Sequence, residues 1–257
     1  MLLVAPPYSS FVSAYDGMVG VEFFRRVRRA FETLARHYDI RFCSAADIGC
    51  GTGLFACYLN RCRGVPVYAV DKSPEMLRVA QCRCHGPGIC FLQQDIRELC
   101  LPELVDLATA NFDTLNHLVT VSDLKLAFRR IAQNLRPGGH FYFDIVTPCH
   151  PLGGLRTYRR AHCTARHSME QRVRWEPARG LIRIRVLHQH SGCAFPTVEL
   201  HTERAYGPGD IGRGLVEAGF VIRGVHDEAT LCVPRSCPPR MIVVAQKRAR
   251  FARVNNN

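Results

Sequence analysis

The sequence has no run of about eighteen apolar residues, which is the length that a membrane-spanning helix needs. It also has no internal repeat, and only the polar end Asn255–Asn257 is of low complexity. We therefore predict neither a membrane span nor a repeat architecture. The opening segment Met1–Pro7 is too short for the apolar core of a signal peptide and lacks its basic start. These absences predict a cytoplasmic protein without a membrane partner.

Lysine is scarce, although the chain is strongly basic. Only Lys72, Lys125 and Lys247 are lysines among 34 basic residues, so arginine carries most of the positive charge. The formal net charge of +12 favours anionic partners. Hydrophobic residues make up 47% of the 257 residues, which argues against a disordered chain. This length and composition predict one large folded domain, or one domain that carries an insertion.

Thirteen cysteines would suggest disulfides in a secreted chain. In a cytoplasmic protein with a large core, reduced thiols are the expected state. Cys43, Cys50 and Cys57 lie in or beside predicted core segments, where cysteine behaves as a small apolar residue. The C-x-C-H-x4-C pattern within residues 82–90 matches no common zinc spacing. We therefore predict no metal site, and ordinary reduced thiols in that segment.

Strand-like and helix-like segments alternate regularly from residue 44 onwards. Strands are expected near 44–49, 66–71, 89–93, 105–110, 140–146, 221–225 and 241–246. Helices are expected over 53–62, 74–84, 123–135 and 209–219. The sequence Leu-Arg-Pro-Gly-Gly at 135–139 predicts the end of a helix followed by a turn. Strands that alternate with helices predict an α/β fold with a doubly wound, mostly parallel, seven-stranded Rossmann-like sheet.

The alternation of strands and helices breaks after Pro148. Three runs there alternate charged and apolar residues, as antiparallel strands with one face in water do; they lie at 171–175, 181–188 and 197–204. We predict an inserted antiparallel β lid that selects the substrate. Its arginines and histidines, with Trp175, are expected to give a carboxylate or phosphate a basic lining. The predicted boundaries are 1–40 for an N-terminal helical cap, 41–148 and 207–257 for the Rossmann-like domain, and 149–206 for the lid.

A glycine-rich turn after the first expected strand is the most informative pattern. Ala45–Ile48 is small and apolar, as a buried parallel strand requires. The following Gly49-Cys-Gly-Thr-Gly53 allows a tight turn whose backbone N–H groups can face a ligand. The next expected strand ends in Asp71, about twenty residues beyond the glycines. In a βαβ unit, this spacing places the Asp71 carboxylate at the ribose hydroxyls of a bound nucleoside.

The spacing of these glycines distinguishes between two nucleoside cofactors. A nicotinamide dinucleotide site has the pattern G-x-G-x-x-G, whereas this chain has G-x-G-x-G. The stretch Asp47–Gly53 resembles instead the first motif of the class I S-adenosylmethionine-dependent methyltransferases. The resemblance covers roughly residues 40 to 147 and resumes from 208 to 247. It implies S-adenosyl-L-methionine as the cofactor.

The resemblance also implies which residues hold the cofactor. In that family the glycine turn accommodates the methionine part, and the acidic residue after the second strand binds both ribose hydroxyls. A carboxylate after the third strand, here Asp95, can accept from the adenine amino group while the Ile96 N–H reaches a ring nitrogen. Asp95 could also be a simple helix cap. The expected cofactor-binding residues are Asp47, Gly49, Cys50, Gly51, Gly53, Asp71, Lys72, Met76, Asp95, Ile96, Asn111 and Phe112.

Candidate catalytic residues follow from the chemistry of methyl transfer. The reaction is an in-line displacement, so an enzyme mainly holds the reactants in line in a dry pocket, and a general base is optional. In the small-molecule subgroup that this chain resembles, an N-terminal tyrosine closes over the sulfonium, which implies Tyr15. His117, Asp113, Asp144 and His150 are the candidate bases, each of which could equally be a polar loop residue.

The acceptor is less constrained than the cofactor. Asn111-Phe112 departs from the Asn-Pro-Pro-aromatic pattern of enzymes that methylate nucleic-acid amino groups, and no aromatic-interleaved basic stripe is present. We therefore predict methyl transfer to an amine or hydroxyl of a small, anionic metabolite rather than to nucleic acid. Two alternatives stay open: an RNA-modifying methyltransferase, and a non-methylating enzyme that cyclises the cofactor and releases methylthioadenosine. Both a monomer and a homodimer are compatible with the sequence.

Overall fold

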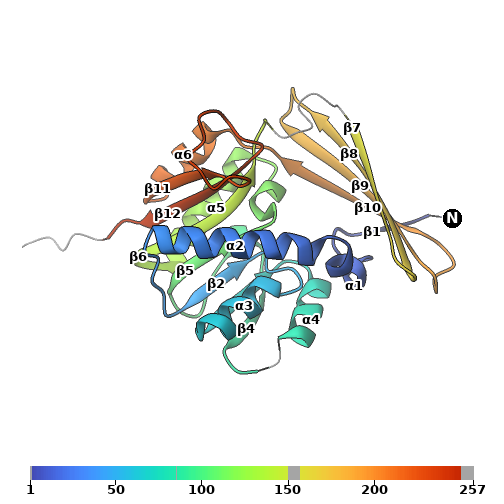
Figure 1. The fold of residues 1–257 in the computed structure, drawn as a ribbon, viewed down its shortest axis with the longest axis horizontal. Coiled ribbons are helices and arrows are strands. Elements are labelled where there is room, and N and C mark those ends of the chain that lie inside the picture. Colours follow the sequence, from blue (N-terminus) through green and yellow to red (C-terminus); the bar gives the residue numbers. More distant parts are fainter. Residues whose placement is uncertain (1, 85, 150–156, 250–257) are drawn as a thin grey trace, which may run out of the picture.

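The computed structural model describes residues 2–84, 86–149 and 157–249. Within these residues, seven strands form one twisted sheet in the order β11-β12-β6-β5-β2-β3-β4 (Figure 1). The strands are β2 (Ala45–Ile48), β3 (Val67–Asp71), β4 (Ile89–Gln93), β5 (Val105–Ala110), β6 (Leu135–Val146), β11 (Phe220–Asp227) and β12 (Arg240–Lys247). Pairing is parallel from β4 to β6, and β12 runs antiparallel to both of its neighbours. The predicted doubly wound, mostly parallel sheet is therefore confirmed.

Helices pack on both faces of this sheet. One face carries α2 (Val21–His37), α3 (Leu54–Arg63) and α4 (Pro74–Arg83), and the other carries α5 (Val121–Asn134) and α6 (Pro208–Glu217) (Figure 1). On the first face, the buried ring of Phe31 lies 5.2 Å from that of Tyr142 and 5.4 Å from that of Phe55. On the second face, Phe141 and Phe143, which flank Tyr142 in β6, pack against α5. The alternation of side chains along β6 thus supplies both halves of the core.

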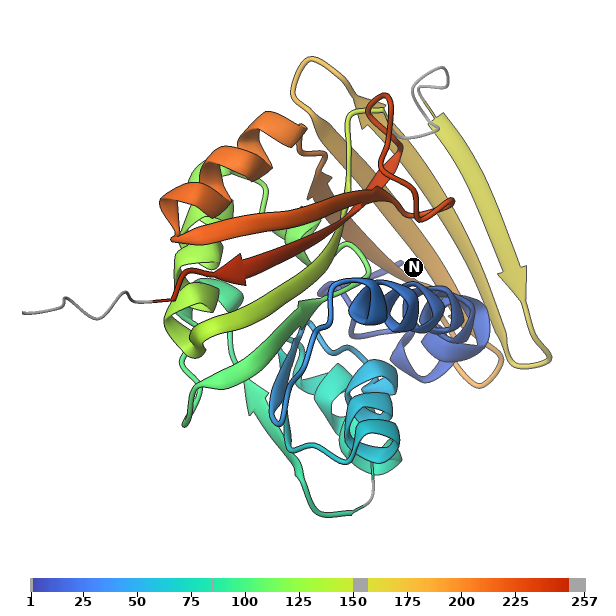
Figure 2. The same ribbon diagram turned by 60° about the vertical axis from the view of Figure 1, so that its left-hand side comes forward.

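A second, five-stranded sheet stands beside the first, in the order β1-β10-β9-β8-β7 (Figure 2). Its strands are β1 (Leu3–Ala5), β7 (Thr157–Cys163), β8 (His167–Glu176), β9 (Leu181–His190) and β10 (Thr197–Arg204). The last four pair antiparallel, and β1 joins the edge of β10 in parallel. The short helix α1 (Val12–Tyr15) and the π-helix η1 (Asp16–Gly20) pack against its inner face, where Met18 and Val19 cluster with Met169 and Val186.

The two faces of the second sheet differ in character. Trp175 lies opposite Ile182, and both side chains are buried. The neighbouring Arg172 and Arg174 point to the other face and are exposed. The prediction that the arginines and Trp175 share one lining was wrong, because successive side chains of a strand point to opposite faces.

The start of β6 also differs from the sequence prediction. Residues 135–139 were expected to form a turn, but they are the first residues of β6. Gly138 has a φ of +83°, and a Cβ on Gly139 would lie 2.9 Å from the carbonyl oxygen of Asp106 on β5. The register between β5 and β6 shifts at this point. The two glycines therefore allow a bulge and a close backbone approach within a strand, rather than a separate turn.

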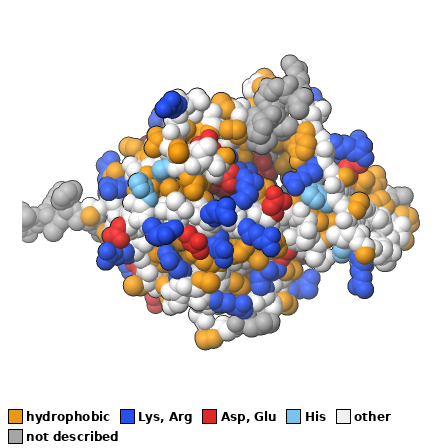
Figure 3. All heavy atoms as spheres, viewed as in Figure 1, with side chains coloured by type: hydrophobic (Ala, Val, Ile, Leu, Met, Phe, Trp, Pro, Cys, Tyr) orange, Lys and Arg blue, Asp and Glu red, His pale blue; other side chains and the backbone are white. Residues whose placement is uncertain are grey.

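The outer surface of α2 is basic. Arg25, Arg26, Arg28 and Arg29 are all exposed, and Figure 3 shows Lys and Arg side chains gathered across the face that α2 crosses. Acidic side chains are interspersed among them; Arg26, for example, binds Glu228. Among the described residues, no helix is long and apolar enough to cross a membrane.

Candidate active site

A cavity of about 570 Å³ opens where β2, β3, β4 and β5 end. In a doubly wound sheet, ligands bind at the carboxyl ends of the strands, because the loops there diverge around a crevice. The N-terminal residues Pro6–Tyr8 and Tyr15 form a further wall, and His201 and Thr202 of β10 contribute from the second sheet. Most of the predicted site residues line this cavity: Tyr15, Asp47, Gly49, Cys50, Gly51, Asp71, Lys72, Met76, Asp95, Ile96, Asn111, Phe112 and His117.

The three glycines of the turn have different local roles. All three have a positive φ, which other residues rarely adopt. A Cβ on Gly49 would lie 2.3 Å from Thr114 Oγ1, and one on Gly53 would lie 2.8 Å from Ala80 Cβ, so both permit close packing. A Cβ on Gly51 would meet nothing within 4 Å. Gly51 lines the cavity and leaves space in it, whereas Gly53 is not part of the lining.

Asp71 connects the glycine turn to the end of β3. One carboxylate oxygen accepts a hydrogen bond from the Gly51 N–H at 2.8 Å, and the other accepts from the Ser73 N–H at 2.8 Å. Burial raises the pKa of Asp71, while these hydrogen bonds lower it. Deeper in the same wall, Asp47 accepts from Thr109 Oγ1 at 2.8 Å, and burial raises the pKa of Asp47 to about 7. The acidic residues at the ends of β2 and β3 therefore fix the shape of the turn.

Asp95 lies at the rim of the cavity after β4. Its carboxylate binds Arg97 at 2.7 Å and Lys72 at 3.0 Å, and it also caps the 3-10 helix η2 (Ile96–Glu98) through the Arg97 N–H. The hydrogen bond from Arg97 holds the pKa of Asp95 well below its usual range. The helix-cap alternative for Asp95 is thus observed, and its role toward adenine stays a prediction.

Asn111 is the least satisfied polar side chain of the cavity wall. It directly follows β5 and is only 3% exposed. Neither its Oδ1 nor its Nδ2 has a hydrogen-bond partner among the described residues. Next to it, Phe112 and Asp113 both have a positive φ, and Phe112 packs its ring on Phe23 at 5.4 Å. A buried amide without partners on a strained turn is typical of a site that completes its hydrogen bonds with a ligand.

Two tyrosines and a histidine form the opposite wall. Tyr8 Oη lies 2.9 Å from His117 Nε2, and the ring of Tyr15 lies 6.2 Å from that of Tyr8. Burial raises the pKa of both tyrosines and lowers the pKa of His117 to about 4. The Oε1 atom of Glu203, on β10, lies 3.8 Å from His117 Nε2. His117 is therefore a neutral imidazole at neutral pH, and the tyrosines are protonated.

Comparison with known proteins agrees with this geometry. Residues 45–139 match the family described as a methyltransferase domain. YqeM of Bacillus subtilis (strain 168), provisionally named a methyltransferase, is 28% identical over 209 residues, which cover 78% of this chain and 83% of that protein. The chain therefore contains a methyltransferase domain. S-adenosylmethionine is the methyl donor of the similar solved structures and stays the predicted cofactor of this chain.

Two solved structures illustrate the shared fold. The S-adenosylmethionine-dependent methyltransferase from Clostridium acetobutylicum ATCC 824 superposes with a TM-score of 0.79 at 23% identity, covering 94% of this chain and 99% of that one. CalS10, an amino pentose methyltransferase from Micromonospora echinaspora solved with the cofactor bound, gives 0.67 at 19% identity and covers 93% and 97%. Two features of the methyltransferase suit this cofactor: the open space where a Cβ of Gly51 would be, and the amide of Asn111, which has no hydrogen-bond partner among the described residues.

Asp113 and Asp144, two of the candidate bases, are not brought into the cavity lining of the methyltransferase. Both bind Arg240 of β12, at 2.6 Å and 2.8 Å. Burial raises the pKa of Asp144 to about 6 and outweighs the lowering effect of Arg240, so both aspartates are set aside by their position and not by their basicity. His150 lies outside the described residues. Among the candidate bases that the structure describes, only His117 therefore has the position that the prediction requires.

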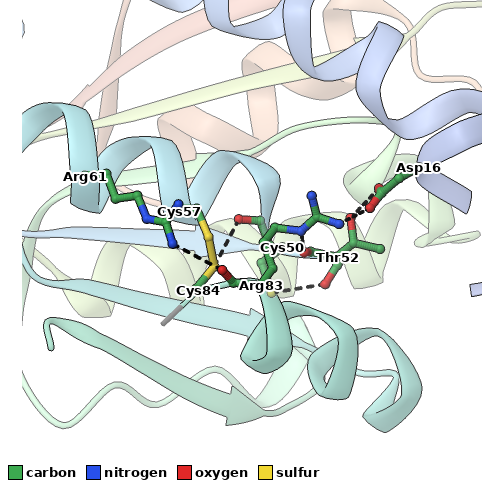
Figure 4. The surroundings of a disulfide bond; sticks show 9 residues. Asp16, Cys50, Thr52, Cys57, Arg61, Arg83 and Cys84 are labelled. Carbon is green, nitrogen blue, oxygen red and sulfur yellow. Dashed lines mark hydrogen bonds and ion pairs between the residues drawn. A yellow bond between two sulfur atoms is a disulfide. The ribbon is translucent and has the colours of Figure 1, made fainter. Parts of the chain in front are cut away.

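The glycine turn is tied to the N-terminal helices and to α4 (Figure 4). Thr52 Oγ1 donates to Asp16 of η1 at 2.6 Å, and Arg83 of α4 binds the same carboxylate. Cys57 of α3 and Cys84 form a disulfide. The prediction of reduced thiols was wrong for this pair, because the spacing within 82–90 was compared with zinc patterns and not with a cysteine on the adjacent helix.

Several residues of the site carry no sequence signal that would reveal them. Tyr8 lies in an irregular segment, and His201 and Glu203 belong to a strand read only as part of a lid. Arg240 begins the last strand, 96 residues from Asp144 and still farther along the chain from Asp113. These residues can be assigned to the site only from the structure, which shows that the second sheet and β12 lie beside the cavity. The alternation of β10, which turns His201 and Glu203 to the same face, was the one usable hint.

Proposed function

We propose that this methyltransferase transfers a methyl group to the nitrogen of a small amine. The observation that carries the proposal is the charge of the cavity wall. Its described lining includes five acidic side chains, of which Asp47 is only partly ionised at neutral pH, and its two cations, Lys72 and Arg97, both bind Asp95. A wall with an excess of negative charge attracts a protonated amine and repels a carboxylate or phosphate. The expectation of an anionic acceptor also loses its basis, because Arg172 and Arg174 lie on the outer face of the second sheet.

In this proposal, the cofactor lies across the ends of β2, β3 and β4. S-adenosylmethionine supplies an electrophilic methyl group whose sulfur leaves as a neutral thioether, so no acid is needed. Gly51 leaves room for the methionine part, and the Asp71 carboxylate accepts from the ribose hydroxyls. Met76 and Ile96 enclose the adenine, with Asp95 at its edge. Asp47, Gly49, Cys50, Gly53 and Lys72 support the turn and the rim.

His117 and the two tyrosines act on the acceptor. An amine attacks in its neutral form, so its proton must leave before transfer. The unprotonated imidazole of His117 can take that proton, and the negative charge of Asp113 favours the resulting cation. Tyr8 orients His117 through the contact to Nε2, and Tyr15 closes the wall and excludes water. Asn111 offers its amide oxygen to an N–H of a bound molecule.

The names of several similar proteins support an amine over a hydroxyl. The cypemycin N-terminal methyltransferase of a Streptomyces species is 31% identical over 103 residues, which are 40% of this chain. The sugar N-methyltransferase KedS8 from Streptoalloteichus shares the fold with a TM-score of 0.72. CalS10 acts on an amino pentose. The acceptors suggested by these names are nitrogen atoms on small or exposed groups, which suits a cavity closed by an N-terminal segment.

The proposal is tested with matched pairs of acceptors. Purified enzyme is incubated with S-adenosylmethionine and with amino sugars or short peptides, each beside its hydroxyl counterpart, and the products are identified by mass spectrometry. S-adenosylhomocysteine should form with amines only, and His117→Gln should slow that reaction most at lower pH. Methylation of hydroxyl partners alone, or of RNA, would overturn the proposal. Methylthioadenosine formed without any acceptor would instead establish cyclisation of the cofactor.

A further inference from the structure

Glu199 of β10 is a fully buried carboxylate that the proposed reaction does not use. Its Oε1 accepts hydrogen bonds from the N–H groups of Ser9 and Ser10 at 3.1 Å and 2.7 Å, and from Ser10 Oγ at 2.7 Å. Its Oε2 accepts from the Tyr8 N–H at 2.7 Å and lies 3.0 Å from His201 Nε2. One side chain of the second sheet thus binds three consecutive backbone N–H groups of a segment about 190 residues away.

That segment, Pro6–Ser10, is called the N-terminal strap here. It follows β1 and has no helical or strand pairing of its own. Pro6, Pro7 and Tyr8 line the cavity, so the strap is one of its walls. On the cofactor side, the carbonyl oxygen of Tyr8 accepts from Ser73 Oγ at 3.0 Å, two residues beyond Asp71. The strap therefore spans from the second sheet to the place where the ribose is expected.

The conformation of the strap depends on Glu199. Tyr8 has a φ of +57°, which is unusual for a bulky residue and persists only where surrounding groups hold it. Three successive N–H groups that converge on one anion form a nest, which is stable only with that anion in place. Without the negative charge of Glu199, the strap loses these hydrogen bonds and the Tyr8 backbone is free to relax.

We propose that Glu199 is a positioning residue that latches the strap over the bound cofactor and thereby sets the rate at which S-adenosylmethionine and its demethylated product are released. The proposed latch requires that the protein binds S-adenosylmethionine, but it does not depend on which acceptor is methylated. Its failure and the failure of the amine proposal are therefore distinguishable. In this proposal the strap moves when the ligand leaves, because Pro6, Pro7 and Tyr8 form part of the cavity wall.

Dissociation of S-adenosylhomocysteine from the full-length protein tests the latch without an acceptor. In a stopped-flow displacement experiment, Glu199→Gln should raise the dissociation rate constant about tenfold or more, since charged hydrogen bonds are lost. Ser10→Ala should raise it by a few-fold, and the two changes should not be additive. Glu176→Gln, in β8 of the same sheet, is the control and should change the rate less than twofold.

Hydrogen exchange separates a latch from general stabilisation. In Glu199→Gln, the amides of residues 8–10 should lose protection while those of β5 keep it. Unchanged release rates in Glu199→Gln, or additive effects of the two substitutions, would overturn the proposal. If Glu199→Gln does not fold, Ser10→Ala decides: faster release with an intact core supports the latch, and an unchanged rate refutes it.

Discussion

Replacing Asn111 with leucine should make the protein more stable and its ligand binding weaker. Asn111 is 3% exposed, and neither polar atom of its amide has a partner among the described residues. A buried polar group without a partner costs about 1–3 kcal/mol, and an apolar side chain of similar volume removes that cost. We therefore expect Asn111→Leu to raise the free energy of unfolding of the ligand-free enzyme by about 1–2 kcal/mol.

The same chain offers a matched control five positions away. Asn116 is also buried, but its amide donates to the carbonyl oxygens of Val146 and Arg204 and accepts from the Val146 N–H. Asn116→Leu removes these three hydrogen bonds and leaves buried backbone groups unpaired, so it should lower the free energy of unfolding by about 3 kcal/mol or more. Identical substitutions should thus have opposite effects on stability.

Urea denaturation and calorimetry measure the two consequences. Denaturation without ligand gives the change in stability, and calorimetry with S-adenosylmethionine should show an affinity about tenfold lower for Asn111→Leu, because a hydrogen-bond partner of the ligand is lost. A fall in stability on Asn111→Leu would refute the reasoning, since it would show that the amide is already satisfied without a ligand. Unchanged affinity together with raised stability would show that the cofactor does not use Asn111.

Three further predictions concern the cofactor, the disulfide and pH. Asp71→Ala should weaken binding of S-adenosylmethionine about 100-fold, because two hydrogen bonds to a charged group are lost; a change below about threefold by calorimetry would contradict the ribose assignment. The Cys57–Cys84 disulfide joins cysteines 27 residues apart, so a dithiol reductant should lower the free energy of unfolding by about 3.5 kcal/mol and the melting temperature by about 10 °C. Equal melting curves of the reduced and oxidised proteins would contradict this prediction. Burial lowers the pKa of His117 to about 4, so its neutral form contributes stability that is complete above about pH 6.5 and is lost as the pH falls toward 4. Burial raises the pKa of Asp47 to about 7, which gives the opposite slope, with stability lost as the pH rises toward 7. We therefore expect the parent to gain free energy of unfolding relative to His117→Gln as the pH rises from 4 to 6.5, by up to about 1.4 kcal/mol per pH unit. A difference that does not change with pH would show that His117 is solvated.

The part of the cavity that the proposal assigns to the cofactor could be located from the sequence, because its signals are local. The glycines at 49–53 and the acidic residue at 71 lie next to buried apolar strands, and the carboxyl ends of those strands must meet at one edge of the sheet. The start of α4 is equally local: Ser73 caps the helix by accepting from the Met76 N–H, and Pro74 follows at the first helical position. Periodicity and turn chemistry were sufficient for these elements.

The acceptor half could not be predicted, because its contacts join distant segments. Arg240 binds Asp113 in the loop after β5 and Asp144 of β6, and Glu199 binds the strap. Neither pairing follows from local spacing. The predicted place of the arginines in the second sheet was wrong for a related reason. The alternation of charged and apolar residues shows that the sheet has a polar and an apolar face. Which face is covered depends on the packing of Met169 and Val186 against the N-terminal helices.

The parallel pairing of β1 with β10 has a consequence for synthesis on the ribosome. Leu3 pairs with Thr197, so the first strand of the chain has no partner until nearly two hundred further residues have been made. At about 5–20 residues per second, this delay is on the order of ten to forty seconds. The central sheet can begin to form during that time, but the wall that β1 leads into can only be put in place once β10 has left the exit tunnel. The nascent enzyme therefore acquires its cofactor pocket in its final form as one of the last steps of its production.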